Sequence, residues 1–186
     1  MKTTPIKTLL TDPKLHQEVC VAGWVRTFRS NRFIALNDGS SLKSIQCVVD
    51  FESMEEGLLK QINTGAALQI QGTLVESQGR GQLVEIQVRH LEILGGADPD
   101  RYPIQPKKHT MEFLREQAHL RVRTNTFGAV MRIRAALAFA VHHYFNSRGF
   151  FYFHAPIITG SDAEGAGEMF RVTTLDPKNP PLTEDG

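Results

Sequence analysis

Short β-rich runs follow one another between residues 18 and 94, and none of them is long before a turn interrupts it. Runs of this kind, bounded by glycine, asparagine, aspartate and serine, are typical of strands joined by turns. The clearest turn signals are Asn37-Asp38-Gly39-Ser40 and Gln78-Gly79-Arg80-Gly81. The sequence therefore predicts an all-β domain with strands at Glu18–Phe28, Arg32–Asn37, Ser44–Phe51, Ala67–Glu76 and Gln82–Ile93.

A helical segment separates the third predicted strand from the fourth. Leu58, Leu59 and Ile62 recur at helical spacing behind Ser53, which can serve as the N-cap. Five strands with one helix between the third and fourth is the layout of an OB-fold, a small partly open barrel whose outer face and loops bind single-stranded nucleic acid. The pattern alone leaves a sandwich fragment and an SH3-like barrel open as alternatives.

The character of the sequence changes at Gly95–Pro106, which has two glycines, three prolines and three charges but no apolar periodicity. Such a stretch indicates a domain boundary. We expect a barrel domain at residues 1–95, a hinge with a short helix at 96–125, and the start of a second, α+β domain at 126–186.

The second domain is predicted to open with a long helix followed by a strand. Thr126 can cap the helix and Gly149 can end it in the C′ position. A strand is predicted over Phe150–Ile158, with Pro156 near its end. The helix is indicated by apolar residues that recur at three- and four-residue steps, namely Val130, Ile133, Leu137, Val141 and Phe145.

Charge and cysteine content limit the possible classes of function. Lys and Arg total 21 against 20 Asp and Glu, so no overall basic field favours nucleic acid, and any RNA contact must be local. Cys20 and Cys47 lie in apolar runs without metal-ligand spacing, which predicts buried free thiols and no metal site. The first residues do not resemble a secretory signal, and no run has the roughly 20 apolar residues of a membrane helix. We expect a cytoplasmic protein without a membrane partner.

Several segments, in order along the chain, resemble one enzyme family. The unit Arg148–Ile158, RGFFYFHAPII, after its long helix, resembles motif 1 of class II aminoacyl-tRNA synthetases. Cys20–Arg29 followed by Phe33–Asp38 is similar to the first barrel strands of the subgroup for aspartate, asparagine and lysine. His119-Leu120-Arg121 is similar to the connector of that family, and Gly160–Val172 to the asparagine enzymes in particular. The chain therefore resembles the N-terminal portion of bacterial-type asparaginyl-tRNA synthetases.

The resemblance implies an asparagine-tRNA ligase, which makes asparaginyl-adenylate from asparagine and ATP with the help of Mg²⁺ and then charges the asparagine tRNA. It also implies a homodimer formed through motif 1. Motifs 2 and 3, whose arginines hold ATP, would lie beyond residue 186. We therefore expect a fragment that carries no catalytic residue, binds no cofactor and is inactive when isolated. Two alternatives are a stand-alone OB-fold tRNA-binding protein with a vestigial catalytic segment and an aspartyl-tRNA synthetase of relaxed specificity.

The family resemblance assigns roles to four residues of the barrel. Phe33 would stack on the central anticodon base, and Gln46 would pair with that base. Arg29, beside Arg26 and Arg32, would contact the anticodon loop, and Glu85 would read a further anticodon position. The residues alone leave other interpretations open: core packing for the phenylalanine, a solvated strand position for the glutamine and the glutamate, and an ordinary solvated turn for the arginines.

In the second domain the resemblance assigns amino-acid binding to Glu164, which would contact the α-ammonium group of the substrate. A carboxylate facing a cation in a closed, water-poor site gains more than on a surface. The small residues Gly165, Ala166 and Gly167 would let the loop close. The role of Glu168 stays open between lining the site and a solvated position.

Overall fold

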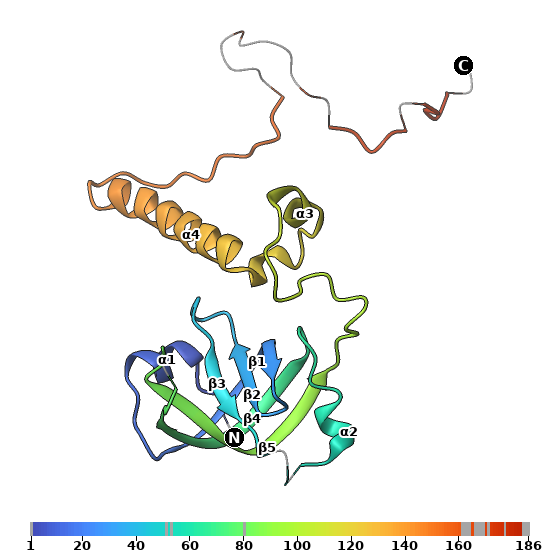
Figure 1. Ribbon diagram of the computed structural model, residues 1–186. Coiled ribbons are helices and arrows are strands. Elements are labelled where there is room, and N and C mark those ends of the chain that lie inside the picture. Colours follow the sequence, from blue (N-terminus) through green and yellow to red (C-terminus); the bar gives the residue numbers. More distant parts are fainter. Residues whose placement is uncertain are drawn as a thin grey trace. The chain divides into compact units, whose positions relative to one another are not determined.

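The computed structural model describes residues 2–50, 52, 54–79, 81–160, 165, 170, 172–176 and 178–183. They divide into two compact units, Met1–Ala138 and Phe139–Gly186. Figure 1 shows the elements, which are α1 (Ile6–Thr11), β1 (Glu18–Arg29), β2 (Phe33–Asn37), β3 (Ile45–Val48), α2 (Glu56–Leu59), β4 (Ala67–Glu76), β5 (Val84–Gly95), α3 (Met111–Glu116), the 3₁₀ turn η1 (Arg121–Arg123) and α4 (Asn125–Asn146).

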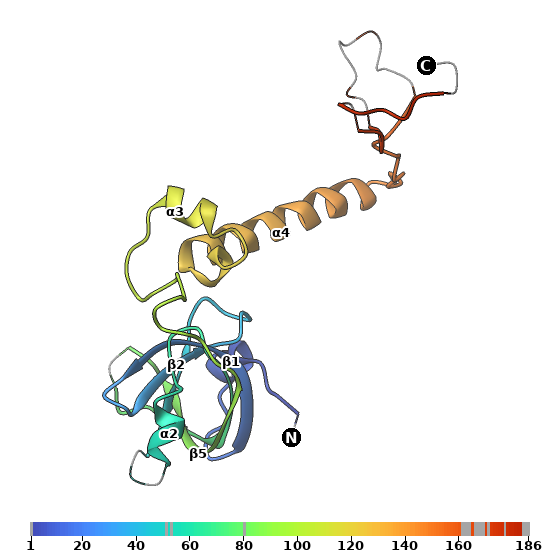
Figure 2. The same ribbon diagram turned by 90° about the vertical axis from the view of Figure 1, so that its right-hand side faces the viewer.

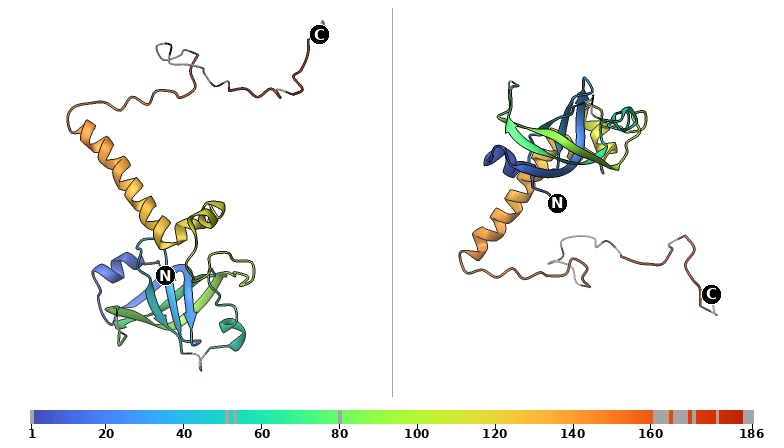
Figure 3. Two further views of the ribbon diagram at one scale, coloured as in Figure 1. Left: turned by 45° about the horizontal axis from the view of Figure 1, so that its top comes forward. Right: turned by 90° about the horizontal axis from the view of Figure 1, so that it is seen from below.

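The five strands close into a barrel in the order β1-β2-β3-β5-β4 and curve around a common interior (Figure 2). The 12-residue β1 takes part in two ladders, because its first half pairs with β4 and its second half with β2. All neighbours are antiparallel except β3 and β5, which run parallel. Figure 3 gives two further views of the barrel. Closure leaves no free sheet edge, and the predicted OB-fold of five strands and one helix is confirmed.

Alternation along the strands fills the barrel interior. On β2, Ile34 and Leu36 are fully buried while their neighbours are only partly covered, and on β3 the buried residues are Ile45 and Cys47. Helix α1 adds Ile6 and Leu9 to the same core. Because one face of each strand packs inward, the other face must lie on the outside of the barrel.

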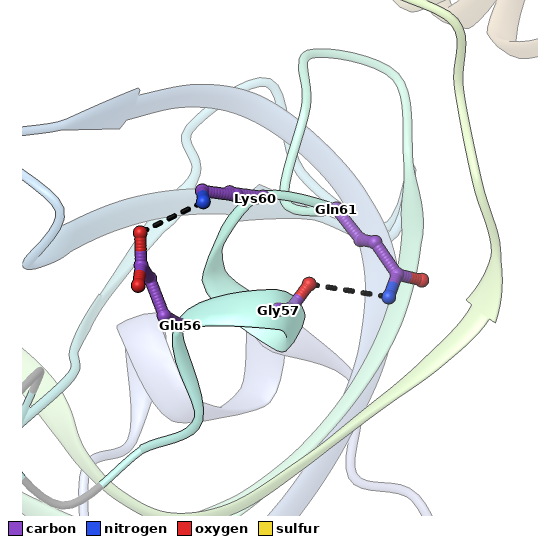
Figure 4. Close-up of polar contacts among 4 residues, drawn as sticks. All are labelled: Glu56, Gly57, Lys60 and Gln61. Atoms are coloured by element: carbon purple, nitrogen blue, oxygen red, sulfur yellow. Dashed lines mark hydrogen bonds and ion pairs between the residues drawn. The ribbon is translucent and has the colours of Figure 1, made fainter.

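Helix α2 is shorter than the predicted helix and begins after Glu55, which makes no side-chain capping bond. The predicted cap, Ser53, lies outside the described residues. Figure 4 shows the polar contacts of this turn: Lys60 pairs with Glu56 at 2.7 Å, and the Gln61 amide donates to the Gly57 carbonyl at 3.2 Å. The partly buried Leu58 and Leu59 pack against the barrel core. Strand β3 ends at Val48, before the predicted end.

The connector after β5 packs against the barrel through rings and guanidinium groups. The Arg123 guanidinium lies 4.5 Å from the centre of the Trp24 ring and donates to the Tyr102 hydroxyl at 3.4 Å. Arg26 of β1 donates to the Arg123 carbonyl and, at 3.2 Å, to the side chain of Asn125. These contacts attach the connector and the first turn of α4 to the barrel. A second small core stabilises the same region and consists of Ile104, Leu114 and Phe127.

Helix α4 begins two residues earlier than the predicted cap Thr126 implies, whereas the predicted glycine cap after its last turn is present. Thr124, not Thr126, is the cap: its backbone is extended (φ −82°, ψ 152°), and its hydroxyl accepts from the Phe127 N–H at 3.3 Å. At the other end Gly149 has φ +84°, and the Phe150 N–H donates to the Phe145 carbonyl at 3.2 Å. This six-to-one bond, with the two rings 5.6 Å apart, is a Schellman motif.

The strand predicted over Phe150–Ile158 is not formed in this structure. No described residue pairs with this segment, and its apolar side chains are exposed, Phe151 and Ile157 above 90%. A strand needs a hydrogen-bonding neighbour, so β-rich composition cannot produce one without it. The strand prediction is therefore wrong for this chain.

Candidate nucleic-acid interface

The four barrel residues singled out in the sequence lie in two neighbouring rows on the outside of the barrel. Strand register defines each row, because residues paired across a ladder lie side by side. The first row runs across four strands through Thr27, Ala35, Gln46 and Glu85. The second row lies two residues further along and runs through Arg29, Phe33, Val48 and Gln87.

The outward direction of Phe33 and Gln46 follows from the buried neighbours on each side of them. Phe33 precedes the fully buried Ile34, and Gln46 stands between the buried Ile45 and Cys47. Both are half-buried. Core packing for Phe33, which the sequence leaves open, is therefore excluded by the structure, while its contact with RNA stays a prediction.

Glu85 is the most unusual residue of the two rows, because it is a carboxylate with only 9% of its surface exposed. Its Oε2 accepts from the Gln46 amide at 3.1 Å, the Ser77 hydroxyl at 2.8 Å and the Gln82 amide at 3.4 Å. No described residue donates to its Oε1. The glutamate is thus held by the third strand and by the turn before β5, and it is not the solvated strand residue that the sequence allows.

Arginines surround Phe33 at the β1–β2 turn. The Arg32 guanidinium lies 5.8 Å from the centre of the Phe33 ring, and Arg29 pairs with Phe33 in the ladder and is exposed. Arg26 does not belong to this cluster, in contrast to the prediction. It points to the connector instead, where burial lowers the pKa of its guanidinium below the ordinary value, partly offset by Tyr102.

A cleft of about 1260 Å³ adjoins the first row, between the barrel and the connector. Thr27 and Ala35 of that row form part of its wall. Among the described residues that line it, none is acidic, whereas Lys43, Lys107 and Lys108 are basic. The nearly neutral chain therefore carries a local positive field next to the predicted anticodon residues, as an RNA contact would require.

Other predicted features lie elsewhere in the chain. Glu164 and Glu168 fall outside the described residues. Cys20 and Cys47 are buried free thiols, as expected, and burial raises the pKa of the Cys47 thiol. Within the described ranges no three His, Cys, Asp or Glu residues come together as a metal site. In the same ranges no helix is both long and apolar enough to cross a membrane.

Sequence reasoning missed the role of Ser77 and Gln82. The Ser77 hydroxyl accepts from the Gln82 amide at 3.0 Å and from the Gly79 N–H at 3.1 Å, and both side chains contact Glu85. Serine beside Gln-Gly in a turn is common, so the only signal is that this turn directly precedes the strand with the glutamate.

Two family models match the chain on either side of the connector. The model described as OB-fold nucleic acid binding domain matches residues 19–94, and the model described as tRNA synthetases class II (D, K and N) matches residues 110–180. The first covers the barrel that carries the two rows. The chain belongs to the family of class II tRNA synthetases for D, K and N.

Within that family the chain matches asparagine-tRNA ligases over its whole length. It is 57% identical to that of Azobacteroides pseudotrichonymphae and 56% identical to that of Cytophaga hutchinsonii, in each case over 100% of this chain and 41% of the relative. The chain thus spans well under half the length of these relatives, as an N-terminal portion. The fold is similar to that of asparaginyl-tRNA synthetase from Pyrococcus horikoshii, whose structure is complexed with asparaginyl-adenylate. The two structures superpose with a TM-score of 0.78 over 93% of this chain and 41% of that one. Because the sequences are only 20% identical, this similarity shows the fold alone.

Proposed function

We propose that the complete protein is an asparagine-tRNA ligase and that the barrel of this chain binds the anticodon loop of asparagine tRNA. The observation that carries the proposal is the placement of Arg29, Phe33, Gln46 and Glu85 on two neighbouring outer rows. The identity with asparagine-tRNA ligases over the whole of this chain supports asparagine as the amino acid and asparagine tRNA as the RNA substrate.

Each residue of the two rows offers the chemistry that an unpaired base needs. The half-buried Phe33 ring offers an apolar platform on which the central uracil stacks. Gln46 lies one row away and offers an amide, which both donates and accepts at the base edge. Glu85 keeps one carboxylate oxygen without a described donor, and that oxygen accepts from a further anticodon base.

Positively charged side chains contact the phosphates of the same RNA loop. Arg29 is exposed at the end of β1, beside the aromatic platform. The cleft beside the first row adds further positive charge, because Lys43, Lys107 and Lys108 line it. Phosphate contacts of this kind position an RNA and make its binding depend on salt.

The rest of the proposed reaction takes place in the catalytic domain. Glu164 binds the α-ammonium group of asparagine, and ATP with Mg²⁺ activates the amino acid in the cytoplasm. Among the described residues no cluster of His, Cys, Asp and Glu fits Mg²⁺, so none of them is assigned to the cofactors. Helix α4 forms the homodimer contact, since Val130, Ile133 and Leu137 are exposed along it.

A pair of phenylalanines tests the proposal. Phe33→Ala should weaken binding of the asparagine anticodon stem-loop by about 1 to 3 kcal/mol and leave the unfolding temperature unchanged, because the ring stacks on RNA and not in the core. The measurements are titration of a fluorescent stem-loop and thermal unfolding followed by circular dichroism.

Phe28→Ala is the matched control, because Phe28 packs against the barrel core. It should lower the unfolding temperature. Normal RNA binding by Phe33→Ala, or a binding loss that is matched by unfolding, would show that Phe33 is no stacking platform.

A further inference from the structure

The contact between Gln46 and Glu85 fixes the direction of a side-chain amide. The two atoms in contact, Nε2 of Gln46 and Oε2 of Glu85, are 3.1 Å apart. An ionised carboxylate can only accept hydrogen bonds, so the amide must turn its nitrogen toward Glu85. Its oxygen, Oε1, then points elsewhere, and no described residue donates to it.

Glu85 is itself held in place by a second layer of donors. The Ser77 hydroxyl already accepts from the Gln82 amide and the Gly79 N–H, which leaves its single hydrogen for Oε2 of Glu85. The Gln82 amide contacts the same oxygen at 3.4 Å. With 9% of its surface exposed, the glutamate has little freedom to turn away from Gln46.

We propose that Glu85 is a positioning residue for Gln46, held by Ser77, and that this arrangement makes the barrel prefer uracil to cytosine at the central anticodon position. The inference rests on the proposed function. It adds a second role for Glu85, beside the contact with a further base, and a first role for Ser77. In the positioning role, Glu85 and Ser77 both act through Gln46 and do not touch the central base.

The chemistry of the two pyrimidines gives the preference its direction. With one amide hydrogen on Glu85, Gln46 presents Oε1 as an acceptor and its remaining amide hydrogen as a donor. Uracil offers the matching pair, its N3–H donor and its O4 acceptor. Cytosine offers N3 as an acceptor and its amino group as a donor, so like groups would face each other. A site that leaves polar groups unpaired in this way rejects the wrong partner strongly.

Removal of the carboxylate should free the amide. In Glu85→Leu, Gln46 can turn over and present its nitrogen to N3 of cytosine. Glu85→Gln is the informative conservative variant, because its amide oxygen can occupy the place of Oε2 and still accept from Gln46 and Ser77. The positioning role requires a hydrogen-bond acceptor at that place but does not require a charge. Glu85→Gln should therefore discriminate between uracil and cytosine at the central position as wild type does.

The experiment measures the ratio of affinities for two anticodon stem-loops that differ only in uracil or cytosine at the central position. The wild-type chain should prefer uracil by about 10- to 100-fold, the range of one good bidentate contact. Glu85→Leu should reduce the preference for uracil to about threefold or less, and Glu85→Gln should keep the wild-type preference. Ser77→Ala, which removes only the second layer, should lower the ratio by a smaller factor.

Glu92→Leu is the matched control, because Glu92 is exposed on the same strand and pairs with Gln69. Its ratio should equal that of wild type. Circular dichroism checks that each variant is folded, and if Glu85→Leu does not fold, Ser77→Ala carries the test. A wild-type ratio in the folded Glu85→Leu, or in Ser77→Ala as its replacement, would overturn the positioning role. Failure of the wild-type chain to bind either stem-loop would instead refute the proposed function itself.

Discussion

Three kinds of side chain lie close to one another on the outer face of β1, β2 and β3: a guanidinium group, an aromatic ring and an amide. Each contributes a different part of RNA binding. Phe33 would supply affinity by stacking, Gln46 would supply identity at the base edge, and Arg29 would supply attraction to phosphate. Substitutions of the three residues should therefore affect RNA binding in different ways.

Arg29→Ala should weaken binding to stem-loops of every anticodon to a similar extent and reduce the slope of affinity against salt by about one, because the guanidinium would neutralise one phosphate. The measurement is fluorescence anisotropy over a series of KCl concentrations.

Arg89→Ala is the control for a loss of positive charge, since Arg89 is exposed on the barrel and pairs with Glu18 at 3.1 Å. It should leave the slope close to that of wild type. A change in the preference between uracil and cytosine in Arg29→Ala would contradict a phosphate contact.

Strand alternation is visible in the sequence, but the side of the strand that faces the core is not. The runs around Phe33 and Gln46 are therefore compatible with either direction, and only closure of the barrel decides it. The misplacement of Arg26 has a definite cause. At the register shift in the β1–β2 ladder, Val25 pairs with Leu36 and Thr27 with Ala35, so Arg26 is the extra residue without a partner on β2 and belongs to neither row.

At the scale of elements, the connector depends on a close approach between Gly65 and Tyr102. Gly65 has φ +91°, and a Cβ atom there would lie 2.6 Å from the Tyr102 ring. Only glycine combines this backbone with such a short separation. The ring in turn stands beside Arg123, so one glycine before β4 affects how the connector lies on the barrel.

Gly65→Ala should destabilise the unit by about 1 to 3 kcal/mol, because alanine is strained at this φ and also displaces the Tyr102 ring. Hydrogen exchange followed by mass spectrometry should show faster exchange around residues 98–106, with little change in β1 and β4.

Gly96→Ala is the matched control, because a Cβ atom at Gly96 meets nothing within 4 Å and its φ is not in the left-handed region. It should be nearly neutral. Equal stability of the two variants would mean that the connector does not depend on this contact.

Local signals predict helix ends better than they predict isolated strands. The cap that Gly149 forms after α4 depends only on backbone geometry within a few residues, and it was predictable. Its start was misplaced because Thr124 and Thr126 are equally suitable caps in sequence, and the 3₁₀ turn before Thr124 decides between them. The segment Phe150–Ile158 has strand composition, but composition cannot show whether a partner strand is present.

At the scale of the whole molecule, α4 carries apolar residues that the described part of the chain leaves exposed. Ile133 is 59% exposed and Leu137 61%. Large exposed apolar surfaces mark interaction sites, in agreement with the homodimer proposed from motif 1. The domain limits at residues 95 and 125 remain predictions.

We expect the chain to form dimers that Leu137→Glu dissociates, because a carboxylate placed in an apolar contact loses its hydration. Light scattering coupled to size-exclusion chromatography gives the mass. Ala135→Glu introduces the same charge on the opposite side of the helix and should remain dimeric. A wild-type monomer at micromolar concentration, or equal dissociation by both variants, would contradict this use of the helix.

The central claim is that the two outer rows of the barrel bind the asparagine anticodon loop. The most direct test is a map of backbone amide chemical shifts of the chain during titration with the asparagine anticodon stem-loop. The account predicts that the largest changes fall on the rows that contain Gln46 and Phe33, and that Gln69 and Gln71 of β4 change little. Changes centred on β4, with the two rows unaffected, would contradict it.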